Sequence, residues 1–428
     1  MPTRREFLGA SGAAVAAPFV FPGEQEPRPA QAEPLPASIR ALSSLRNRAR
    51  PITVEERQAR LERARQLLAA EKLDALMLTG GTSLRYFTNI DWGLSERLLA
   101  LLVPREARPF VVCPAFERDR AAEQIEAGPL KGSADVLTWE EHESPYQRIA
   151  EGLRARGLTT GRVGVEETVR YVFASGTAAA LPAMTLASGT PVSAGCRMVK
   201  SAHELELMRL ACEVTLKAYE AAYRALKDGM TQDDFAKLVS QAHDRLGFRG
   251  GAGVQVGPYS ALPHGSTTPQ IIREGTILLI DGGCTAEGYA SDISRTFVLG
   301  KATDRMKQVF EIEQRAQRTA LAAARPGVEC QAVDAAARKV ITDSGFGPDY
   351  KYFSHRVGHG MGMDGHEWPY LVRGNTLPLQ PGMVFSDEPG IYLKGEFGVR
   401  LEDDMHITES GAELFTPTSP SLENPFGR

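Results

Sequence analysis

The chain has 428 residues, a length that predicts two or three domains. Hydrophobic residues make up 43% and charged residues 24%, the balance of an ordinary globular protein. The net charge of -4 argues against the basic surface that a nucleic-acid-binding protein or a protein held on an anionic membrane needs. The five cysteines are scattered and never spaced as CxxC, so we expect buried thiols rather than disulfides or a zinc-thiolate site.

The first 32 residues have the pattern of an export signal. The pair Arg4-Arg5 precedes a Gly/Ala-rich apolar run that ends at Val20, which resembles a bacterial twin-arginine signal. That run is shorter than the roughly 20 residues of a membrane-spanning helix. A small-x-small cleavage site follows at 30–32. We predict that residues 1–32 direct export to the periplasm or another extracytoplasmic space, without a stable membrane span. The alternative is a disordered basic tail.

Residues 50–195 alternate between helical and strand-like patterns. An amphipathic helix is expected from Val54 to Lys72, because leucines and alanines recur there at helical spacing. Apolar, strand-like runs and helical segments then alternate, with strands at 75–79, 98–103, 109–112 and 162–165 and helices at 117–125 and 146–156. This alternation predicts an N-terminal α/β domain. We find no catalytic constellation in it.

Residues 200–428 mix helices with hairpins. Ser201 with Glu204, and Thr231 with Asp234, have the spacing of helix-capping boxes, so helices are expected to run from these caps to about 226 and 246. Two further helices are expected at 303–324 and 331–344, and strands at 252–258, 276–283, 289–298, 383–393 and 396–407. The pattern predicts an α+β domain.

The first chemical signal is a pair of aspartates. Asp281 and Asp292 lie on two apolar runs separated by a short turn. A hairpin centred between Ala286 and Glu287 would place them directly opposite each other, with Cβ atoms roughly 5 Å apart. Facing carboxylates repel unless a positive charge lies between them, and a divalent cation is the simplest candidate.

The same arrangement recurs near the C-terminus. A hairpin centred on Gly395 would pair Glu388 with Glu402. Between the two carboxylate pairs lies His359, with a glycine on each side that lets another segment approach closely. Four carboxylates and one imidazole make a hard, oxygen-rich site that suits manganese or another first-row divalent ion. Two such ions would balance the four carboxylates.

The order Asp, Asp, His, Glu, Glu at these spacings resembles the pita-bread metallopeptidases, which include methionine aminopeptidase, Xaa-Pro aminopeptidase and prolidase. Residues 50–195 resemble the N-terminal domain shared by Xaa-Pro aminopeptidase, prolidase and creatinase. The resemblance implies two divalent metal ions, Mn²⁺ in the first place, with Co²⁺, Zn²⁺ or Fe²⁺ as alternatives. It implies that Asp281 chelates one ion, that Asp292 and Glu402 bridge both, and that His359 and Glu388 hold the other.

The resemblance also implies catalytic roles. His264 matches a histidine on the substrate side, and His366 matches one that contacts the scissile carbonyl or its tetrahedral intermediate. Arg400 matches an arginine that braces the carboxylates, and Glu388 would shuttle a proton from water to the leaving nitrogen. A metal-bridging hydroxide would cleave the bond between an N-terminal residue and proline in a small peptide. Relatives commonly form homodimers through the N-terminal domain.

Several functions stay open at this point. An Xaa-Pro dipeptidase needs a cation for the carboxylate of its substrate, and Arg373 lies near the position where prolidases carry one. An aminopeptidase needs an open channel instead. A non-peptidase enzyme on the same scaffold, such as a metal-dependent lyase of small sulfonium compounds, is the alternative, and a binding module that has lost catalysis ranks last. His355 is expected to be structural rather than a ligand.

Overall fold

The computed structural model describes residues 34–427, so the predicted export signal lies outside them. From Ala37 onward the chain forms one compact unit. It begins with two short helical segments, α1 (Ala37–Arg40) and η1 (Arg46–Arg48). Among the helices of the described residues, none combines the length and the apolar character needed to cross a membrane.

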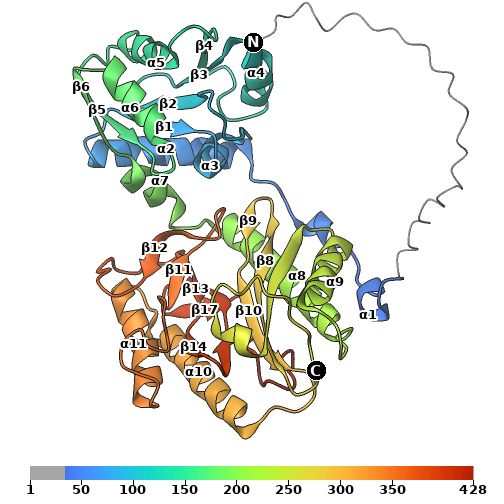
Figure 1. The fold of residues 1–428 in the computed structure, drawn as a ribbon. Coiled ribbons are helices and arrows are strands. Elements are labelled where there is room, and N and C mark those ends of the chain that lie inside the picture. The colour runs from blue at the N-terminus through green and yellow to red at the C-terminus, as the bar shows by residue number, and fades with distance from the viewer. Residues whose placement is uncertain (1–33, 428) are drawn as a thin grey trace, which may run out of the picture. The chain divides into compact units, whose positions relative to one another are not determined.

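The N-terminal part of this unit is built on a six-stranded sheet with the order β4-β3-β2-β1-β5-β6 (Figure 1). Its strands are β1 (Ala75–Thr79), β2 (Ala100–Pro104), β3 (Phe110–Pro114), β4 (Asp135–Trp139), β5 (Gly161–Val165) and β6 (Met184–Ser188). The predictions of β1, β2, β3 and β5 are confirmed. The edge strands β4 and β6 were not predicted, because they are half exposed and their sequences lack a continuous apolar run.

Helices cover both faces of this sheet. Alternate residues of β1 point to opposite faces: Leu76 and Leu78 pack with one group of helices, and Ala75 and Met77 with the other. The first group is α2 (Val54–Ala70), α3 (Thr82–Thr88), α4 (Arg118–Glu126) and α7 (Thr190–Arg197), and the second is α5 (Pro145–Arg154) and α6 (Tyr171–Ala180). The predicted α/β class of this part is confirmed.

The helices of the C-terminal part begin where the sequence predicts. They are α8 (Ala202–Tyr223), α9 (Gln232–Leu246), α10 (Asp304–Ala323) and α11 (Cys330–Asp343). Ser201 and Thr231 form complete capping boxes with Glu204 and Asp234. All five cysteines are free and buried, as expected.

The strands of the C-terminal part form three sheets. One contains β7 (Gly250–Val256), β8 (Ile277–Ala286), β9 (Tyr289–Ala290) and β10 (Ile293–Val298). The second has the order β12-β11-β13-β16-β17, with β11 (Gly358–Gly360), β12 (Glu367–Leu371), β13 (Val384–Asp387), β16 (Asp403–Ile407) and β17 (Ala412–Leu414). The third pairs β14 (Gly390–Leu393) with β15 (Phe397–Arg400).

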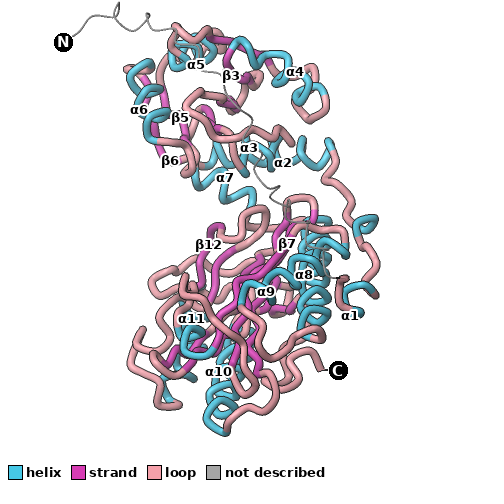
Figure 2. The backbone as a smooth tube through the Cα atoms, turned by 45° about the vertical axis from the view of Figure 1, so that its right-hand side comes forward, coloured by secondary structure: helices cyan, strands magenta, loops and turns pink. Residues whose placement is uncertain are grey.

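Helices flank these sheets (Figure 2). Helices α8 and α9 pack against β8 and β7, while α10 and α11 share a core with strands of the other two sheets. This is the predicted α+β class. The three long predicted strands 289–298, 383–393 and 396–407 are each interrupted, and the breaks fall at Asp292, Glu388 and Glu402. These breaks let carboxylates from different sheets converge.

Candidate metal centre

Asp281 lies in the middle of β8, between β7 and β10. Its partner in β10 is Ser294, so the prediction that Asp292 lies directly opposite it is wrong. The chain turns at Glu287 and Gly288, whose φ values of 51° and 93° match a two-residue hairpin turn. This turn lies one residue later than predicted, which shifts the register by two residues. Because side chains alternate with a period of two, Asp292 stays on the predicted face.

Glu388 and Glu402 lie between two ladders. The pairing of β13 with β16 ends at Asp387 opposite Asp403, and the pairing of β14 with β15 continues in the same alignment. That alignment places Glu388 opposite Glu402, and the predicted hairpin register is confirmed here. Neither glutamate belongs to a strand. Glu402 lies close to Asp281 and Asp292, and Glu388 lies close to His359.

The candidate ligands form three overlapping groups. Within each group, one ligand atom per residue lies within 4.8 Å of all the others: Asp281 with Asp292 and Glu402, His359 with Glu388 and Glu402, and Asp292 with His359 and His366. All five residues predicted to bind metal are therefore brought together. Glu402 joins the group that contains Asp281 to the group that contains His359.

His359 is held by the backbone of β11. Its Nδ1 donates to the carbonyl oxygen of Gly360 at 3.2 Å, because a carbonyl can only accept. The Nε2 atom then faces Glu388 Oε1 at 3.2 Å and Asp292 Oδ2 at 3.9 Å. A Cβ atom at Gly358 would lie 2.0 Å from the carbonyl oxygen of Ser386 in β13, so only glycine lets the two strands approach this closely.

Without a cation between them, the four carboxylates cannot all be ionised at once. Burial, and then the charge of Asp281, raise the pKa of Asp292 to about 7. Burial and the charge of Asp292 hold the pKa of Glu402 well above its usual range. Burial also opposes ionisation of Glu388, but the hydrogen bond and charge of His359 outweigh it and lower the pKa to about 2. The site is thus short of positive charge.

The donor set fits divalent cations. Four carboxylates and one imidazole, partly or fully buried, suit a hard or borderline ion such as Mn²⁺ better than a soft thiophilic one. Cations at this position would remove the mutual repulsion that raises the pKa of Asp292. Asp281, Asp292, His359, Glu388 and Glu402 are the residues that would hold them.

Arg400 is buried against the carboxylates. Its Nη2 lies 2.6 Å from Asp281 Oδ2, and its Nε donates to Ser294 Oγ at 2.9 Å. The Ser294 hydroxyl in turn lies 2.7 Å from both Asp281 Oδ1 and Glu402 Oε2. The predicted bracing position of Arg400 agrees with these contacts. Ser294 was not singled out from the sequence, although it lies two residues after Asp292 and so on the same face.

A second chain of hydrogen bonds leads away from Arg400. Its Nη1 donates to the Tyr392 hydroxyl at 3.1 Å, and that hydroxyl lies 2.7 Å from His355 Nε2. Because His355 Nδ1 donates to the carbonyl oxygen of Arg356 at 2.8 Å, Nε2 accepts from Tyr392. Burial lowers the pKa of His355, which keeps it neutral. His355 belongs to none of the three ligand groups, which agrees with the structural role expected for it.

The two predicted catalytic histidines differ in how closely they approach the centre. The His366 ring stacks on the His359 ring, with centroids 3.6 Å apart and planes at 15°. Burial and the positive charge of His359 lower the pKa of His366. His264 lies exposed on the loop after η3 (Gly257–Ala261) and lines a cavity of about 330 Å³ beside β7. It contributes no atom to the ligand groups.

Arg373, the predicted carboxylate-binding cation, is already paired. Its Nη2 lies 2.9 Å from Asp349 Oδ1 in an exposed ion pair. Arg356 is a half-buried arginine that was not singled out from the sequence. Its guanidinium lies 4.2 Å from the centre of the Tyr370 ring, and Tyr370 is the partner of His359 across β11 and β12. A basic residue three positions before the histidine ligand was the signal that could have found it.

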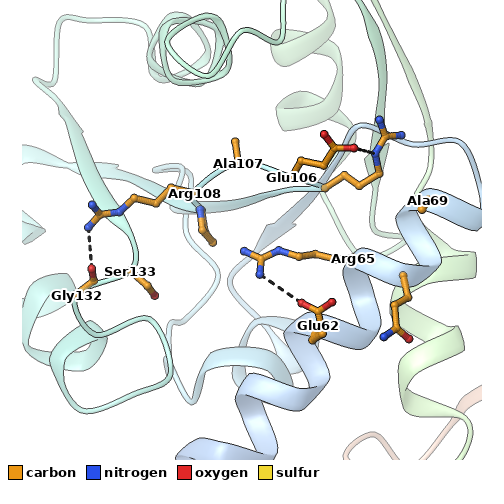
Figure 3. Close-up of a pocket in the computed structure, with 11 residues that line it drawn as sticks. Glu62, Arg65, Ala69, Glu106, Ala107, Arg108, Gly132 and Ser133 are labelled. Atoms are coloured by element: carbon orange, nitrogen blue, oxygen red, sulfur yellow. Dashed lines mark hydrogen bonds and ion pairs between the residues drawn. The ribbon is translucent and has the colours of Figure 1, made fainter.

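A groove of about 700 Å³ lies in the N-terminal part between α2, the β2–β3 loop and the segment before β4 (Figure 3). Three arginines line it, but each already faces a carboxylate: Arg65 with Glu62, Arg105 with Glu106, and Arg108 with Asp135. The groove contains none of the predicted site residues, and its arginines offer little unpaired charge to an anionic ligand.

Two known domains match this chain. Residues 206–409 match metallopeptidase family M24, and residues 60–199 match the creatinase/prolidase N-terminal domain. Together the two matches account for the six-stranded sheet and for all five candidate metal ligands.

Whole proteins match as well. An Xaa-Pro dipeptidase of Lactobacillus delbrueckii subsp. lactis is 34% identical over 85% of this chain and 98% of its own length. The crystal structure of dipeptidase PepE from Mycobacterium ulcerans superimposes with a TM-score of 0.81 at 33% identity, covering 87% of this chain and 99% of that one. An Xaa-Pro dipeptidase from Bacillus anthracis gives a TM-score of 0.74 at 26% identity, covering 86% and 99%.

Proposed function

This chain belongs to metallopeptidase family M24, and from that premise we propose that it is an Xaa-Pro dipeptidase that uses two divalent metal ions. The observation that carries the proposal is the convergence of Asp281, Asp292, Glu388 and Glu402 with His359. Solved and curated relatives of similar length carry the name Xaa-Pro dipeptidase. Mn²⁺ is the ion we propose, because the donors are mainly carboxylate oxygens.

The chemistry that such ions supply when bound is Lewis acidity, which makes a water more acidic and a scissile carbonyl more electrophilic. The residues of the chain supply the rest. Glu388 lies in one ligand group with His359 and Glu402, and its carboxylate would accept a proton from the attacking water. That proton would then pass to the leaving proline nitrogen, which carries no hydrogen of its own in the peptide.

His366 would stabilise the negative charge that develops on the carbonyl oxygen. Its lowered pKa keeps the imidazole neutral at pH 7, and a neutral imidazole still offers one N–H donor. Donors fixed in advance contribute most where charge develops in the transition state. His264, exposed on its loop, would reach the same substrate only from the solvent side.

The choice of a dipeptidase over an aminopeptidase rests on Arg356. A dipeptide has its free carboxylate next to the scissile bond, and a cation must bind that charge there. Arg356 is half-buried, and within the described chain no carboxylate pairs with it. Its guanidinium lies over the Tyr370 ring, and Tyr370 pairs with His359, so Arg356 lies beside the strand that carries the histidine ligand.

A substrate panel tests the proposal. The purified chain is loaded with Mn²⁺ and given Ala-Pro, Ala-Pro-Ala and Ala-Ala, with an Asp292→Ala variant beside it. We expect cleavage of Ala-Pro alone, and no cleavage by the variant. Release of alanine from Ala-Pro-Ala would make the chain an aminopeptidase. Failure to cleave any proline peptide with two ions bound would contradict the peptidase and favour the lyase alternative, which small sulfonium substrates then test.

Arg356→Gln separates the two peptidases further. We expect KM for Ala-Pro to rise about 10-fold or more, because a charge-assisted hydrogen bond to the carboxylate is lost. KM for Ala-Pro amide, which has no carboxylate, should not change between the two proteins. Arg373→Gln is the matched control and should leave both KM values unchanged. An equal effect of Arg356→Gln on acid and amide would contradict the assigned role.

We also propose that the chain is exported by the twin-arginine route and works outside the cytoplasm as a homodimer. The Arg4-Arg5 motif with its apolar run supports export. The resemblance to proteins that commonly form homodimers supports the dimer. Cell fractionation of the full chain, compared with a variant in which both arginines are lysine, tests the first point. Light scattering of the purified chain tests the second. Equal cytoplasmic retention of both proteins, or a monomer, would contradict these proposals.

A further inference from the structure

His366 lies on a short segment that is fixed on both sides. Asp364, two residues earlier, accepts a hydrogen bond from Thr82 Oγ1 at 2.6 Å and lies 2.6 Å from Arg197 Nη2. Glu367, the next residue, is the first residue of β12 and pairs with Gly360 at a register shift of the β11–β12 ladder. The chain is therefore held by other elements at Asp364 and at Glu367, on either side of the histidine, while the His366 side chain itself is exposed.

The carboxylate of Glu367 is fully engaged. Lys200 Nζ donates to one oxygen at 2.7 Å, and Arg197 Nη2 contacts the other. Arg197 Nη1 also donates to Ser83 Oγ at 3.2 Å, and Ser83 Oγ donates a hydrogen bond to Glu166 Oε1 at 2.9 Å. The cations come from the end of α7 and the link to α8, and Ser83 belongs to the N-terminal sheet domain.

Burial gives this network a fixed geometry. The side chains of Lys200, Glu367 and Arg197 are only 2%, 7% and 9% exposed. Buried charges are costly unless they are paired with good geometry, so a two-cation, two-carboxylate network has few alternative arrangements. Asp364 is 38% exposed and closes the network at the surface.

A second buried network joins the same two parts of the chain through side chains that, within the described residues, form no hydrogen bond or ion pair with residues 364–367. Arg60 of α2 pairs with Glu204 of α8 at 3.0 Å. The Tyr289 hydroxyl lies 2.8 Å from Glu204 and 2.7 Å from Arg60. This second network already holds the two parts of the chain together, so that role does not explain why the first network converges on Asp364 and Glu367, on either side of His366.

We propose that Arg197 and Lys200 are positioning residues for His366. They act through the two carboxylates that flank it, Asp364 and Glu367. The N-terminal domain, which holds no catalytic constellation, thereby sets the orientation of a catalytic histidine in the other domain. The inference rests on the proposed function, because it assumes that His366 acts on the substrate.

A double-mutant cycle tests the inference. Asp364→Asn and Glu367→Gln remove one charge each, and Tyr289→Phe is the matched control that weakens the second network instead. Each is measured alone and combined with His366→Ala, after thermal unfolding and metal content have shown that the variant is folded and loaded. We expect Asp364→Asn to lower kcat about 10-fold to 100-fold with KM nearly unchanged, because small misplacements of a catalytic group are costly.

In the His366→Ala background the same substitution should change kcat by less than about twofold, because the group that it positions is gone. Tyr289→Phe should leave kcat unchanged in both backgrounds. An equal loss in both backgrounds, no loss in either, or an equal effect of Tyr289→Phe would overturn the inference. Undiminished kcat in His366→Ala alone would instead remove the role of His366, and that single variant shows it separately.

Histidine NMR gives a readout that needs no activity. The chain has eight histidines, and the His366 ring signals are assigned in the metal-free protein as those lost in His366→Ala. We expect Asp364→Asn to shift or broaden the His366 signals, and Tyr289→Phe to leave them in place. If the His366 signals neither shift nor broaden in Asp364→Asn, the inference is overturned, whether or not the chain cleaves proline peptides.

Discussion

Two hairpins supply the carboxylates, and they differ in how firmly the sequence determines their register. The hairpin of β14 and β15 turns at Gly395, a lone glycine with a φ of 84°. The hairpin of β8 and β9 turns within Ala286-Glu287-Gly288. The composition of this segment allows a two-residue turn at Ala286-Glu287 as well as one at Glu287-Gly288. The first register is as predicted, and the second is shifted by two residues.

The difference shows what a metal centre requires of its strands. A shift of two residues keeps Asp281 and Asp292 on one face, whereas a shift of one would separate them. In both hairpins one or both carboxylates lie at a break in the ladder, where the side chains are free to converge. The centre therefore depends on which face each carboxylate occupies more than on directly opposed pairs.

The largest effect is expected where the two hairpins meet. Glu402 belongs both to the group with Asp281 and to the group with His359. We expect Glu402→Gln to abolish binding of the second ion and to lower kcat/KM at least about 1000-fold, since Lewis-acid stabilisation contributes several kcal/mol. Elemental analysis and Ala-Pro hydrolysis measure both. A variant that keeps two ions and full activity would contradict the ligand assignment.

A smaller effect is expected from the arginine that joins the hairpins. Arg400, on β15, pairs with Asp281 on β8 and is only 4% exposed. Arg400→Met leaves that carboxylate, which is 35% exposed, without its partner, so we expect the free energy of unfolding of the metal-free protein to fall by roughly 1 to 2 kcal/mol. Urea unfolding measures this loss. Arg373→Met, which breaks an exposed pair, is the control and should cause no measurable change. Equal stability of the two variants would contradict the account.

The pH dependence of the metal-free protein tests the aspartate pair. Burial and Asp281 raise the pKa of Asp292 from 3.8 to about 7 in the folded state, so the folded protein binds this proton more tightly than the unfolded one. The resulting stability is complete below the unfolded pKa and is lost as the pH rises through about 7. We expect the metal-free protein to melt at a lower temperature at pH 8 than at pH 5.5.

Two comparisons isolate the contribution of Asp292 to that loss. Asp292→Asn should melt with a much weaker dependence on pH, because its amide does not titrate. Mn²⁺ should restore the stability of the unsubstituted protein at pH 8. A metal-free protein whose stability rises from pH 5.5 to pH 8 would contradict the proposed repulsion between the aspartates.

The smallest effects are expected at the two turns. Gly288→Ala and Gly395→Ala each place a side chain at positive φ, which costs roughly 1 kcal/mol. A Cβ atom at Gly288 would also lie 3.2 Å from Met363 Cε, whereas at Gly395 it would meet nothing within 4 Å. We expect Gly288→Ala to be the more destabilising of the two in urea unfolding. The opposite order would show that the two turns differ in some other way.

The sequence determined the ligands better than their surroundings. Asp281, Asp292, His359, Glu388 and Glu402 stand in short motifs whose glycines and apolar flanks indicate the local structure. Helix starts were predictable for a similar reason, because a capping box is complete within four residues. The fold class of both domains followed from the alternation and periodicity of apolar residues.

What the sequence could not supply depends on contacts between distant segments. Strands β4 and β6 are half exposed, so their patterns carry little information. Arg373 was favoured by its position along the chain, but Asp349 pairs with it, and Arg356, which lies over the Tyr370 ring beside β11, was not singled out. The network of Arg197 and Lys200 joins residues about 170 positions apart, a separation over which no local pattern acts.

The central claim is that five side chains hold two divalent ions which act together in hydrolysis, and a metal titration tests it most directly. The metal-free chain is titrated with Mn²⁺ while bound metal and hydrolysis of Ala-Pro are measured in the same samples. We predict two equivalents bound and activity that reaches its maximum only with the second. Binding of no more than one ion at saturation, or full activity in the metal-free chain, would contradict the account.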